Sequence, residues 1–513
     1  MNKYRTILIV IIIAYFFLFF FFGMFRHWGF LTTFVDLAKY DREILNVIET
    51  GRLFSTYHVH FDPIHLIFVP FYLIYPTVAW IVAAQAMAVS MAAWIIFLLA
   101  ARIFESERIG LTWALIFLVN PFLLNAAAWD VDTITLAVPF VALGFLALDS
   151  RNFKIMLFAV LFILACKQHL GLMIFGFGIL WWITNRQWKH GVALMTIGLG
   201  YFFLVLQVIM PALSPSGQIV MMSESSGTAS RYAWLGNSLV EVIQTIITQP
   251  ISILETVLIS MGGLGYLVLL LIPFLFFPLL GLIYLLPGMA DLAANMLSAN
   301  PMPRSPIAYH SAALIPIFTV AAIYGVKTLS KWQKRFSVKE LSVLVLIASA
   351  LMGYVFAPFP IPGAANVWAP ASFVSLPDPR VQEIRSLVGK DASVSVQNNI
   401  GAHFSQNKEI YRYPSRIDLV DVVILRLESP TKNIHNYSEE RKETRRFIIG
   451  MLDNHLQMDR EDYLSSVEEL LLGEEFGVIY WDNPWLVLKR GDADHENISD
   501  IMKKLRELKL KWL

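Results

Sequence analysis

The chain has 513 residues, of which 57% are apolar and only 15% are charged. A soluble globular protein has about 45–50% apolar and about 25% charged residues, so the composition excludes an ordinary soluble enzyme. The net charge of +1 provides no excess of Lys and Arg for a phosphate backbone, and we expect no nucleic-acid partner. The single cysteine, Cys166, excludes an internal disulfide framework and a cysteine-based zinc cluster.

The charges are unevenly distributed along the chain. Of the 40 basic and 39 acidic residues, 44 lie in residues 359–513 and 35 lie in the first 358. We therefore predict a multi-span membrane domain over residues 1–358 and a soluble domain over residues 359–513. A segment rich in proline, residues 358–364, separates them.

Apolar runs long enough to cross about 30 Å of hydrocarbon recur along the first domain. The first, residues 7–25, follows Lys3 and Arg5, and no small-residue cleavage site comes after it, which favours a retained helix over a signal peptide. With ten further runs, the sequence predicts about eleven transmembrane helices. The further runs are residues 77–100, 110–128, 132–148, 153–166, 169–184, 190–210, 255–273, 276–294, 307–327 and 340–357.

The distribution of Lys and Arg predicts the orientation. With a cytoplasmic N-terminus, 13 basic residues lie in inner loops and 7 in outer loops, which is the bias that cytoplasmic loops show. An odd number of spans then makes the C-terminal domain extracytoplasmic. We thus predict a multi-pass protein of the plasma membrane. Its two longest loops, 26–76 and 211–254, lie on the outer face, where long loops usually carry function.

The first outer loop begins with apolar residues at helical spacing, which predicts an amphipathic helix along the membrane surface. These residues are Leu37, Tyr40, Ile44 and Val47. Asp36 and Asp41 lie at its start. A partly desolvated carboxylate there has a raised pKa and can act as a general base. The alternative is that either carboxylate caps the helix or faces water.

Three histidines and an aspartate, His58, His60, Asp62 and His65, follow in the same loop. Imidazole and carboxylate groups are common metal ligands. Their spacing across Pro63 matches no zinc signature, so no cofactor is firmly implied and a divalent metal is the less favoured alternative.

Polar residues also gather at other outer loops. Asp130 and Asp132 either serve a functional site or cap the helix that begins near Thr133. Lys167 and His169 suit a phosphate or an anionic headgroup, although Lys167 could simply snorkel to the interface.

Two later loops each combine cations with aromatic residues or prolines. They contain Arg231 and Tyr232, and Arg304 and His310. Cations of this kind bind pyrophosphate or lipid phosphate, and neighbouring aromatic rings stack on sugar faces. The sequence therefore predicts that any chemistry lies on the outer face.

The soluble domain has the pattern of a small α/β fold. Alternation predicts strands at 392–397 and 419–425 and a hairpin from 477–481 and 485–489. A charged helix is expected near 437–457, and a basic amphipathic helix from Ile498. It lacks a Gly-rich phosphate loop, so we interpret it as a lid or an acceptor-recognition module.

The whole chain resembles the membrane family called domain of unknown function 2079. The resemblance is carried by short motifs from the first loop to the tail. They are Asp36-Leu-Ala-Lys-Tyr-Asp41, His60-Phe-Asp-Pro63, Asn120-Pro121, Trp129-Asp130, Lys167, Arg231-Tyr-Ala-Trp-Leu-Gly236, His310, residues 394–405 and residues 410–414. The chain departs from the family pattern at Ala38, where glycine is expected, and at Gln168 and His169, where acidic residues are expected.

This resemblance implies a fold and a reaction. The family is regarded as related to the GT-C superfamily, multi-span glycosyltransferases that use polyprenyl-phosphate-linked sugar donors. It implies an inverting transfer to a glycan, lipid or protein acceptor beside the membrane lipids, with Asp36 as the catalytic carboxylate. The candidate substrate-binding residues are Asp41, His60, Asp130, Asp132, Lys167, His169, Arg231, Tyr232, Arg304 and His310.

Two alternatives stay open. One is a transporter or flippase of lipid-linked sugars, and the other is a non-catalytic GT-C-like membrane protein. Transporters place polar groups near the bilayer midplane. Because the ionisable residues of this sequence gather at one face, the pattern favours surface chemistry.

Overall fold

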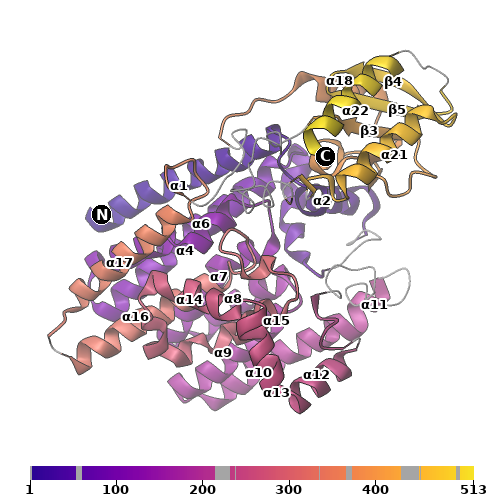
Figure 1. The fold of residues 1–513 in the computed structure, drawn as a ribbon. Coiled ribbons are helices and arrows are strands. Elements are labelled where there is room, and N and C mark those ends of the chain that lie inside the picture. The colour runs from indigo at the N-terminus through magenta and orange to yellow at the C-terminus, as the bar shows by residue number, and fades with distance from the viewer. Residues whose placement is uncertain are drawn as a thin grey trace. The chain divides into compact units, whose positions relative to one another are not determined.

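The computed structural model describes residues 3–52, 60–213, 231–236, 238–333, 335–364, 373–428, 450, 452–453, 455–492 and 497–513 (Figure 1). The chain divides into two compact units. The helical unit comprises Met1–Phe20, Leu53–Ile67 and Val82–Trp368, and the sheet unit comprises Phe21–Arg52, Phe68–Ile81 and Ala369–Leu513. Part of the first outer loop thus belongs to the same unit as the tail, and a domain boundary at residue 358 stays a prediction.

The helical unit is built from apolar helices, which confirms the predicted fold class. The helix α1 (Lys3–Trp28) begins in this unit and ends in the sheet unit. The others, in chain order, are α4 (Ala79–Phe104), α5 (Glu107–Leu118), α6 (Pro121–Ala128), α7 (Thr133–Asp149), α8 (Phe153–Cys166), α9 (Leu170–Asn185), α10 (Trp188–Leu204), α11 (Met210–Leu213), α12 (Leu239–Thr248), α13 (Pro250–Glu255), α14 (Gly263–Leu271), α15 (Met289–Leu297), α16 (Leu314–Trp332) and α17 (Val338–Val355). A 3₁₀-helical stretch, Phe277–Gly288, leads into α15.

Within the described residues, six helices are long and apolar enough to cross a membrane, or up to eight if each of two bent pairs is one span. The pair α5 and α6 bends by 58°. The bend has a local cause, because Pro121 starts α6 and the Asn120 side chain accepts a hydrogen bond from Phe122 N. Shorter apolar helices fill the remaining predicted spans, and the count of about eleven crossings stays a prediction.

The helices α9 and α10 pack through glycines. A Cβ atom on Gly198 would lie 2.4 Å from the carbonyl oxygen of Gly171, and one on Gly191 would lie 2.8 Å from that of Gly178. Both glycine pairs are seven residues apart on their helices, which keeps them on one face. The two backbones therefore approach more closely than larger side chains allow, as small residues permit in membrane helix pairs.

The sheet unit combines parts of the long loop 26–76 with the tail. Its elements in chain order are a π-helical turn (Phe34–Ala38), α2 (Lys39–Thr50), α3 (Val69–Ile74), α18 (Pro379–Val388), β1 (Ser393–Val396), α19 (Gly401–Phe404), β2 (Glu409–Arg412), β3 (Val422–Arg426), α21 (Arg460–Leu472), β4 (Phe476–Asp482), β5 (Trp485–Arg490) and α22 (Ile498–Trp512). The predicted strands, the hairpin and the C-terminal helix are confirmed. The helix expected near 437–457 falls largely outside the described residues.

The five strands are ordered β2-β1-β3-β5-β4. The strand β1 is parallel to β2 and β3, and β5 is antiparallel to β3 and β4. Successive residues of β3 alternate between two cores: Val423 and Leu425 pack with α21 and α22, whereas Val422 and Ile424 pack on the other face. Phe30, just after α1, packs in this second core.

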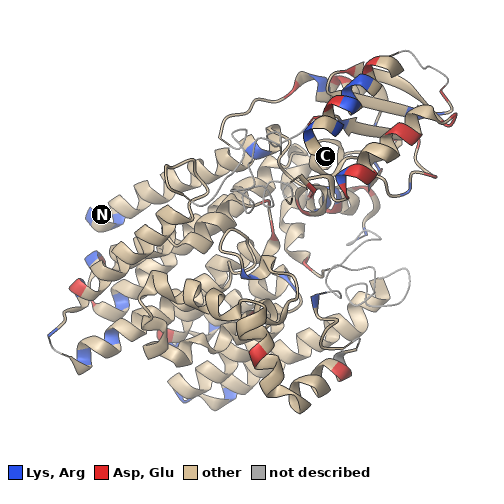
Figure 2. Cartoon of the chain, in the orientation of Figure 1, with Lys and Arg blue, Asp and Glu red and all other residues tan. Residues whose placement is uncertain are grey.

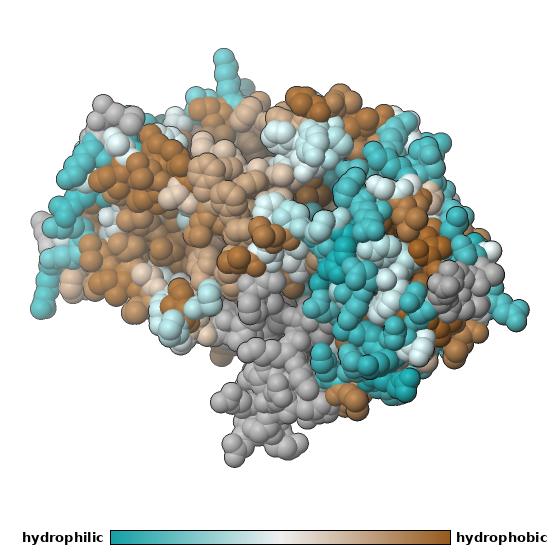
Figure 3. Space-filling model, turned by 90° about the horizontal axis from the view of Figure 1, so that it is seen from above, coloured by the Kyte–Doolittle hydropathy of each residue, from teal (hydrophilic) through white to brown (hydrophobic). Residues whose placement is uncertain are grey.

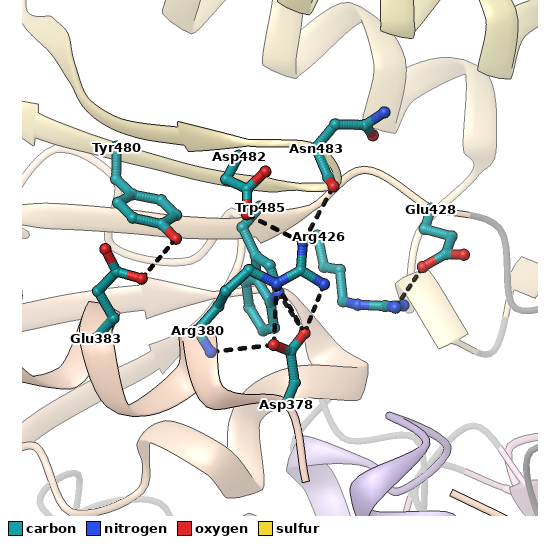
Figure 4. A network of polar contacts seen from close by, with 9 residues as sticks. All are labelled: Asp378, Arg380, Glu383, Arg426, Glu428, Tyr480, Asp482, Asn483 and Trp485. Atoms are coloured by element: carbon teal, nitrogen blue, oxygen red, sulfur yellow. Dashed lines mark hydrogen bonds and ion pairs between the residues drawn. The ribbon is translucent and has the colours of Figure 1, made fainter. Parts of the chain in front are cut away.

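Hydrogen bonds and ion pairs connect α18 to the hairpin β4–β5 (Figure 4). Asp378 caps α18 by accepting from Arg380 N, and it also accepts from the guanidinium of Arg380 and from Trp485 Nε1 at 3.0 Å. Arg380 in turn donates to Asp482 and to the carbonyl of Asn483. The network stabilises the first helix of the tail on the sheet.

The two units differ in surface chemistry. Figure 2 shows charged residues concentrated on the sheet unit, with few on the helices of the helical unit. The space-filling view has the same contrast, with hydrophobic side chains over the helices and hydrophilic ones gathered over the sheet unit (Figure 3). This is the surface that a membrane body and a water-exposed domain require.

The glycine contact between α9 and α10 predicts a difference between two neighbouring positions. Gly198→Ala should lower stability by about 1–3 kcal/mol, because its Cβ would overlap the Gly171 carbonyl and force the helices apart. The matched control is Gly200→Ala on the same helix, since a Cβ there meets nothing within 4 Å. Thermal unfolding of the purified full-length protein measures both; equal unfolding temperatures for the two variants would contradict the close contact.

Candidate functional site

Most candidate residues of the helical unit lie where helices start or end. Asp132 caps α7 by accepting from Ile134 N at 2.8 Å. Lys167 directly follows α8, and His169 directly precedes α9. His310 lies in the loop before α16. Polar residues between apolar helices thus come together because the helices end at similar depth.

The closest charged contact in this group is a buried ion pair. Lys167 Nζ lies 2.8 Å from the Asp132 carboxylate, and the two residues are 5% and 3% exposed. Gln85 of α4 supports the pair by accepting from Asp132 N and donating to the carbonyl of Trp129. Asp132 therefore both caps a helix and holds a cation.

Aromatic rings lie beside this pair. Lys167 Nζ is 5.5 Å from the centroid of the Tyr309 ring, and Tyr309 also packs on Trp129 and on His310. The imidazole of His310 stacks on Tyr309 with ring centroids 4.3 Å apart and makes no hydrogen bond to a described residue.

The loop 231–236 and Arg304 converge on the end of α15. Tyr232 donates to the carbonyl of Ala294, and Ala299 N donates to the carbonyl of Arg231. The Arg304 guanidinium donates to the carbonyls of Asn295, Met296 and Ser298. Arg304 thus caps the helix end, whereas the Arg231 side chain makes no hydrogen bond or ion pair among the described residues.

Asp291 of α15 belongs to the same neighbourhood but was not among the residues expected from sequence. Its Oδ1 lies 3.5 Å from Nε2 of His169, and its charge interacts with that of Lys167. The residue lies inside the apolar run 276–294, which we interpreted only as a span. A carboxylate within such a run was the signal that could have identified it.

Two other expected residues, His60 and Asp130, lie near the turn between α8 and α9 and in the turn before α7, and His60 is half-buried. Gln168 binds the loop segment at His60, with Nε2 3.1 Å from His60 Nδ1 and Oε1 accepting from Phe61 N. Asp130 is buried in the turn that precedes α7. Of the residues considered for a metal, His58 lies outside the described residues, and His65 Nδ1 contacts the backbone carbonyl of Asp62.

Asp36 lies in the sheet unit, in the π-helical turn before α2. It is half-buried and accepts a hydrogen bond from Thr33 Oγ1 at 3.3 Å. The tail holds this turn: Asn398 accepts from Phe34 N, and Gly401 leaves room for the Phe34 ring, which a Cβ would meet at 2.6 Å. The predicted helix follows as α2.

Asp41 is enclosed within the same unit. One carboxylate oxygen accepts from the Tyr72 hydroxyl and the other from Ser405 Oγ. Burial raises the pKa of Asp41, and the hydrogen bonds from the two hydroxyls only partly offset it. Asp41 therefore joins α2, α3 and the tail, while Asp36 is the more accessible carboxylate of the two.

The comparisons with known proteins agree with a membrane protein. No curated protein matches the chain. Among solved structures, ArnT from Cupriavidus metallidurans in the apo state is similar, with a TM-score of 0.48 and 12% sequence identity over 94% of this chain and 98% of that chain. The family described as predicted membrane protein DUF2079 matches residues 26–457. Because this match spans most of the chain, the protein belongs to the DUF2079 family of membrane proteins.

Proposed function

We propose that the protein is a membrane glycosyltransferase that moves a sugar from a polyprenyl-phosphate-linked donor to an acceptor on the outer face of the membrane. The observation that carries this proposal is a group of cations, carboxylates and aromatic rings that meet between apolar helices of the helical unit. We call this group the polar centre; it consists of Asp132, Lys167, Arg231, Asp291, Tyr309 and His310. Such a centre matches a ligand that has a lipid, a phosphate and a sugar. The relation of the family to GT-C enzymes, a resemblance at the level of sequence, supports the reaction class.

The donor phosphate is bound by Arg231 and Lys167 in this proposal. The Nε atom of Arg231 has no hydrogen-bond partner among the described residues, so it can donate to an anion. His310 can donate a hydrogen bond to a phosphate oxygen. Tyr309 and Trp129 offer ring faces to the sugar. Arg304 acts indirectly, since its hydrogen bonds hold the end of α15.

The chemistry requires a base for the acceptor. The acceptor hydroxyl oxygen attacks the anomeric carbon, and its proton goes to the Asp36 carboxylate. The bond from that carbon to the phosphate oxygen breaks, and the polyprenyl phosphate leaves with the electron pair. Attack opposite to the leaving group inverts the anomeric configuration. Asp41 holds the loop that carries Asp36, because both of its oxygens are already occupied.

The acceptor and the orientation complete the proposal. The basic bias of the inner loops supports a cytoplasmic N-terminus and an extracytoplasmic tail. The tail would serve as the lid or acceptor-recognition module for a glycan, lipid or protein. None of the steps above requires a metal.

A flippase of lipid-linked sugars is the second candidate. Two sharply bent helix pairs favour it, because broken helices are typical of transporters. The helices Glu107–Leu118 and Pro121–Ala128 bend by 58°, and Val240–Thr248 and Pro250–Ser260 bend by 94°. A flippase moves donor across vesicle membranes without forming product, whereas a transferase consumes donor and releases polyprenyl phosphate.

Asp36→Asn should lower transfer by about 10²–10⁴-fold, because the amide cannot accept the acceptor proton while keeping an oxygen for Thr33. The measurement uses cells that lack the protein and carry each variant. Mass spectrometry then quantifies the envelope glycans and the polyprenyl-phosphate sugars. Accumulated donor with missing product is the expected result.

The control for Asp36 is Glu49→Gln, which removes a carboxylate at the other end of the adjacent helix α2. This variant should restore the glycan as the wild type does. Gel filtration of both purified proteins checks folding. Normal glycan in cells that carry a folded Asp36→Asn protein would rule out Asp36 as the base.

Lys167→Met should destabilise the protein by about 3–5 kcal/mol, because it leaves the buried Asp132 without its partner. The double variant Lys167→Met/Asp132→Asn removes both charges and keeps an oxygen for Ile134, so it should regain stability but bind a synthetic polyprenyl phosphate more weakly. Thermal unfolding and binding in nanodiscs measure the two effects. Wild-type affinity in the double variant would show that Lys167 is only structural.

A further inference from the structure

The helix α15 carries a buried carboxylate that the proposed reaction does not use. Asp291 is the single charged residue of this helix and is 5% exposed. It lies in Phe277–Leu297, a helix apolar enough to span the membrane. A carboxylate in such a position is costly and by default marks a functional site.

The hydrogen bonding of Asp291 is incomplete. Its nearest polar partner, His169 Nε2, is 3.5 Å from Oδ1, which exceeds the usual N–H···O distance of about 2.7–3.2 Å. Its other oxygen, Oδ2, has no hydrogen-bond partner in the described part of the chain. Buried carboxylate oxygens are nearly always satisfied in native proteins, so this oxygen calls for a donor that the described residues do not supply.

Among the described residues, a cation that lacks an acceptor lies near Asp291, which lacks a hydrogen-bond donor. The charges of Arg231 and Asp291 both act on the Tyr232 hydroxyl, which is bound to Ala294 one turn along α15. The Arg231 head has no acceptor among the described residues, and Asp291 has an oxygen without a donor. Lys167, whose charge reaches Asp291, is already paired with Asp132.

One class of ligand supplies both missing partners. A phosphate provides acceptors for Arg231, and hydroxyl groups provide donors for Asp291. A fully ionised lipid phosphate has no hydroxyl donor, and a free sugar has no anion. A sugar phosphodiester has both, joined by one glycosidic bond.

We infer that Asp291 is the sugar-hydroxyl subsite of the protein, where its carboxylate accepts hydrogen bonds from hydroxyl groups of a sugar held as a polyprenyl phosphodiester. This inference rests on the proposed function and deepens it, because it names the residue that distinguishes the glycosylated lipid from the bare lipid phosphate. The subsite determines sugar specificity, since a site built around a hydroxyl leaves a buried group unpaired when that hydroxyl is missing.

The test compares two kinds of probe on full-length protein in nanodiscs. One probe is a synthetic polyprenyl phosphate, and the others are the same lipid phosphate carrying a hexose, an N-acetylhexosamine or a pentose. For the sugar that the wild type binds most tightly, Asp291→Asn should lose about tenfold or more of the affinity that the sugar adds, while affinity for the bare lipid phosphate stays within about twofold.

Two controls keep the result specific. Asp149→Asn removes a carboxylate at the other end of α7, one that is bound by Arg102 and Tyr324, and should leave sugar discrimination unchanged. Lys167→Met/Asp132→Asn should weaken the binding of every probe alike. Unfolding temperatures of all variants establish that each is folded.

The outcomes separate the subsite from the function. If Asp291→Asn keeps the full sugar-dependent gain, or loses affinity for the bare lipid phosphate to the same degree, the subsite is wrong even though the proposed function stands. If the wild type binds none of the glycosylated probes more tightly than the bare lipid phosphate, the proposed function fails, and the subsite fails with it.

Discussion

The buried ion pair between Lys167 and Asp132 determines how the polar centre of the helical unit can work. Charges between apolar helices are tolerated only when they are paired and hydrogen-bonded. Asp132 meets both conditions, because it caps α7 and binds the residue that follows α8. The pair is neutral as a whole, so Lys167 offers an incoming anion only part of its field. Among the described residues, Arg231 is a cation of the centre whose Nε has no acceptor.

In the sheet unit, contacts with the tail and with α3 fix the position of the loop that follows α1. The loop after α1 enters the second sheet core through Phe30, and Asp41 then binds Tyr72 and Ser405. Since these contacts come from the tail and from α3, the position of Asp36 depends on residues several hundred positions later in the sequence. The tail is thus part of the support of the candidate base, and a variant in its core can affect Asp36 without touching it.

The sequence predicted the features that local patterns determine. Polar residues between apolar runs indicated the helix ends, so Asp132, Lys167 and His310 could be identified as candidates without a structure. The bend between α5 and α6 was not predicted, because residues 110–128 read as one apolar run. Asp291 was missed because the mean hydropathy of an apolar run stays high when the run contains a single carboxylate. The use of Arg304 on backbone carbonyls, and the enclosure of Asp41, follow from the meeting of distant segments. No local pattern contains that information, so both residues looked like ligand-binding groups.

The polar centre also lowers the stability of the free protein, because some of its polar atoms lack, within the described part of the chain, hydrogen-bond partners that a ligand can supply. Among the described residues, the buried atom Nε of Arg231 lacks an acceptor and Oδ2 of Asp291 lacks a donor, and a buried polar atom without a hydrogen bond costs about 1–3 kcal/mol. Groups of opposite charge in one unit could have paired with each other, yet Arg231 is held by its backbone to Ala299 and Asp291 by its helix. A bound molecule that joins an anion to hydroxyl donors satisfies both at once, so the two halves of the ligand reinforce each other. Such a site lowers the stability of the empty protein, but it lets the protein discriminate between the glycosylated lipid and the bare lipid phosphate.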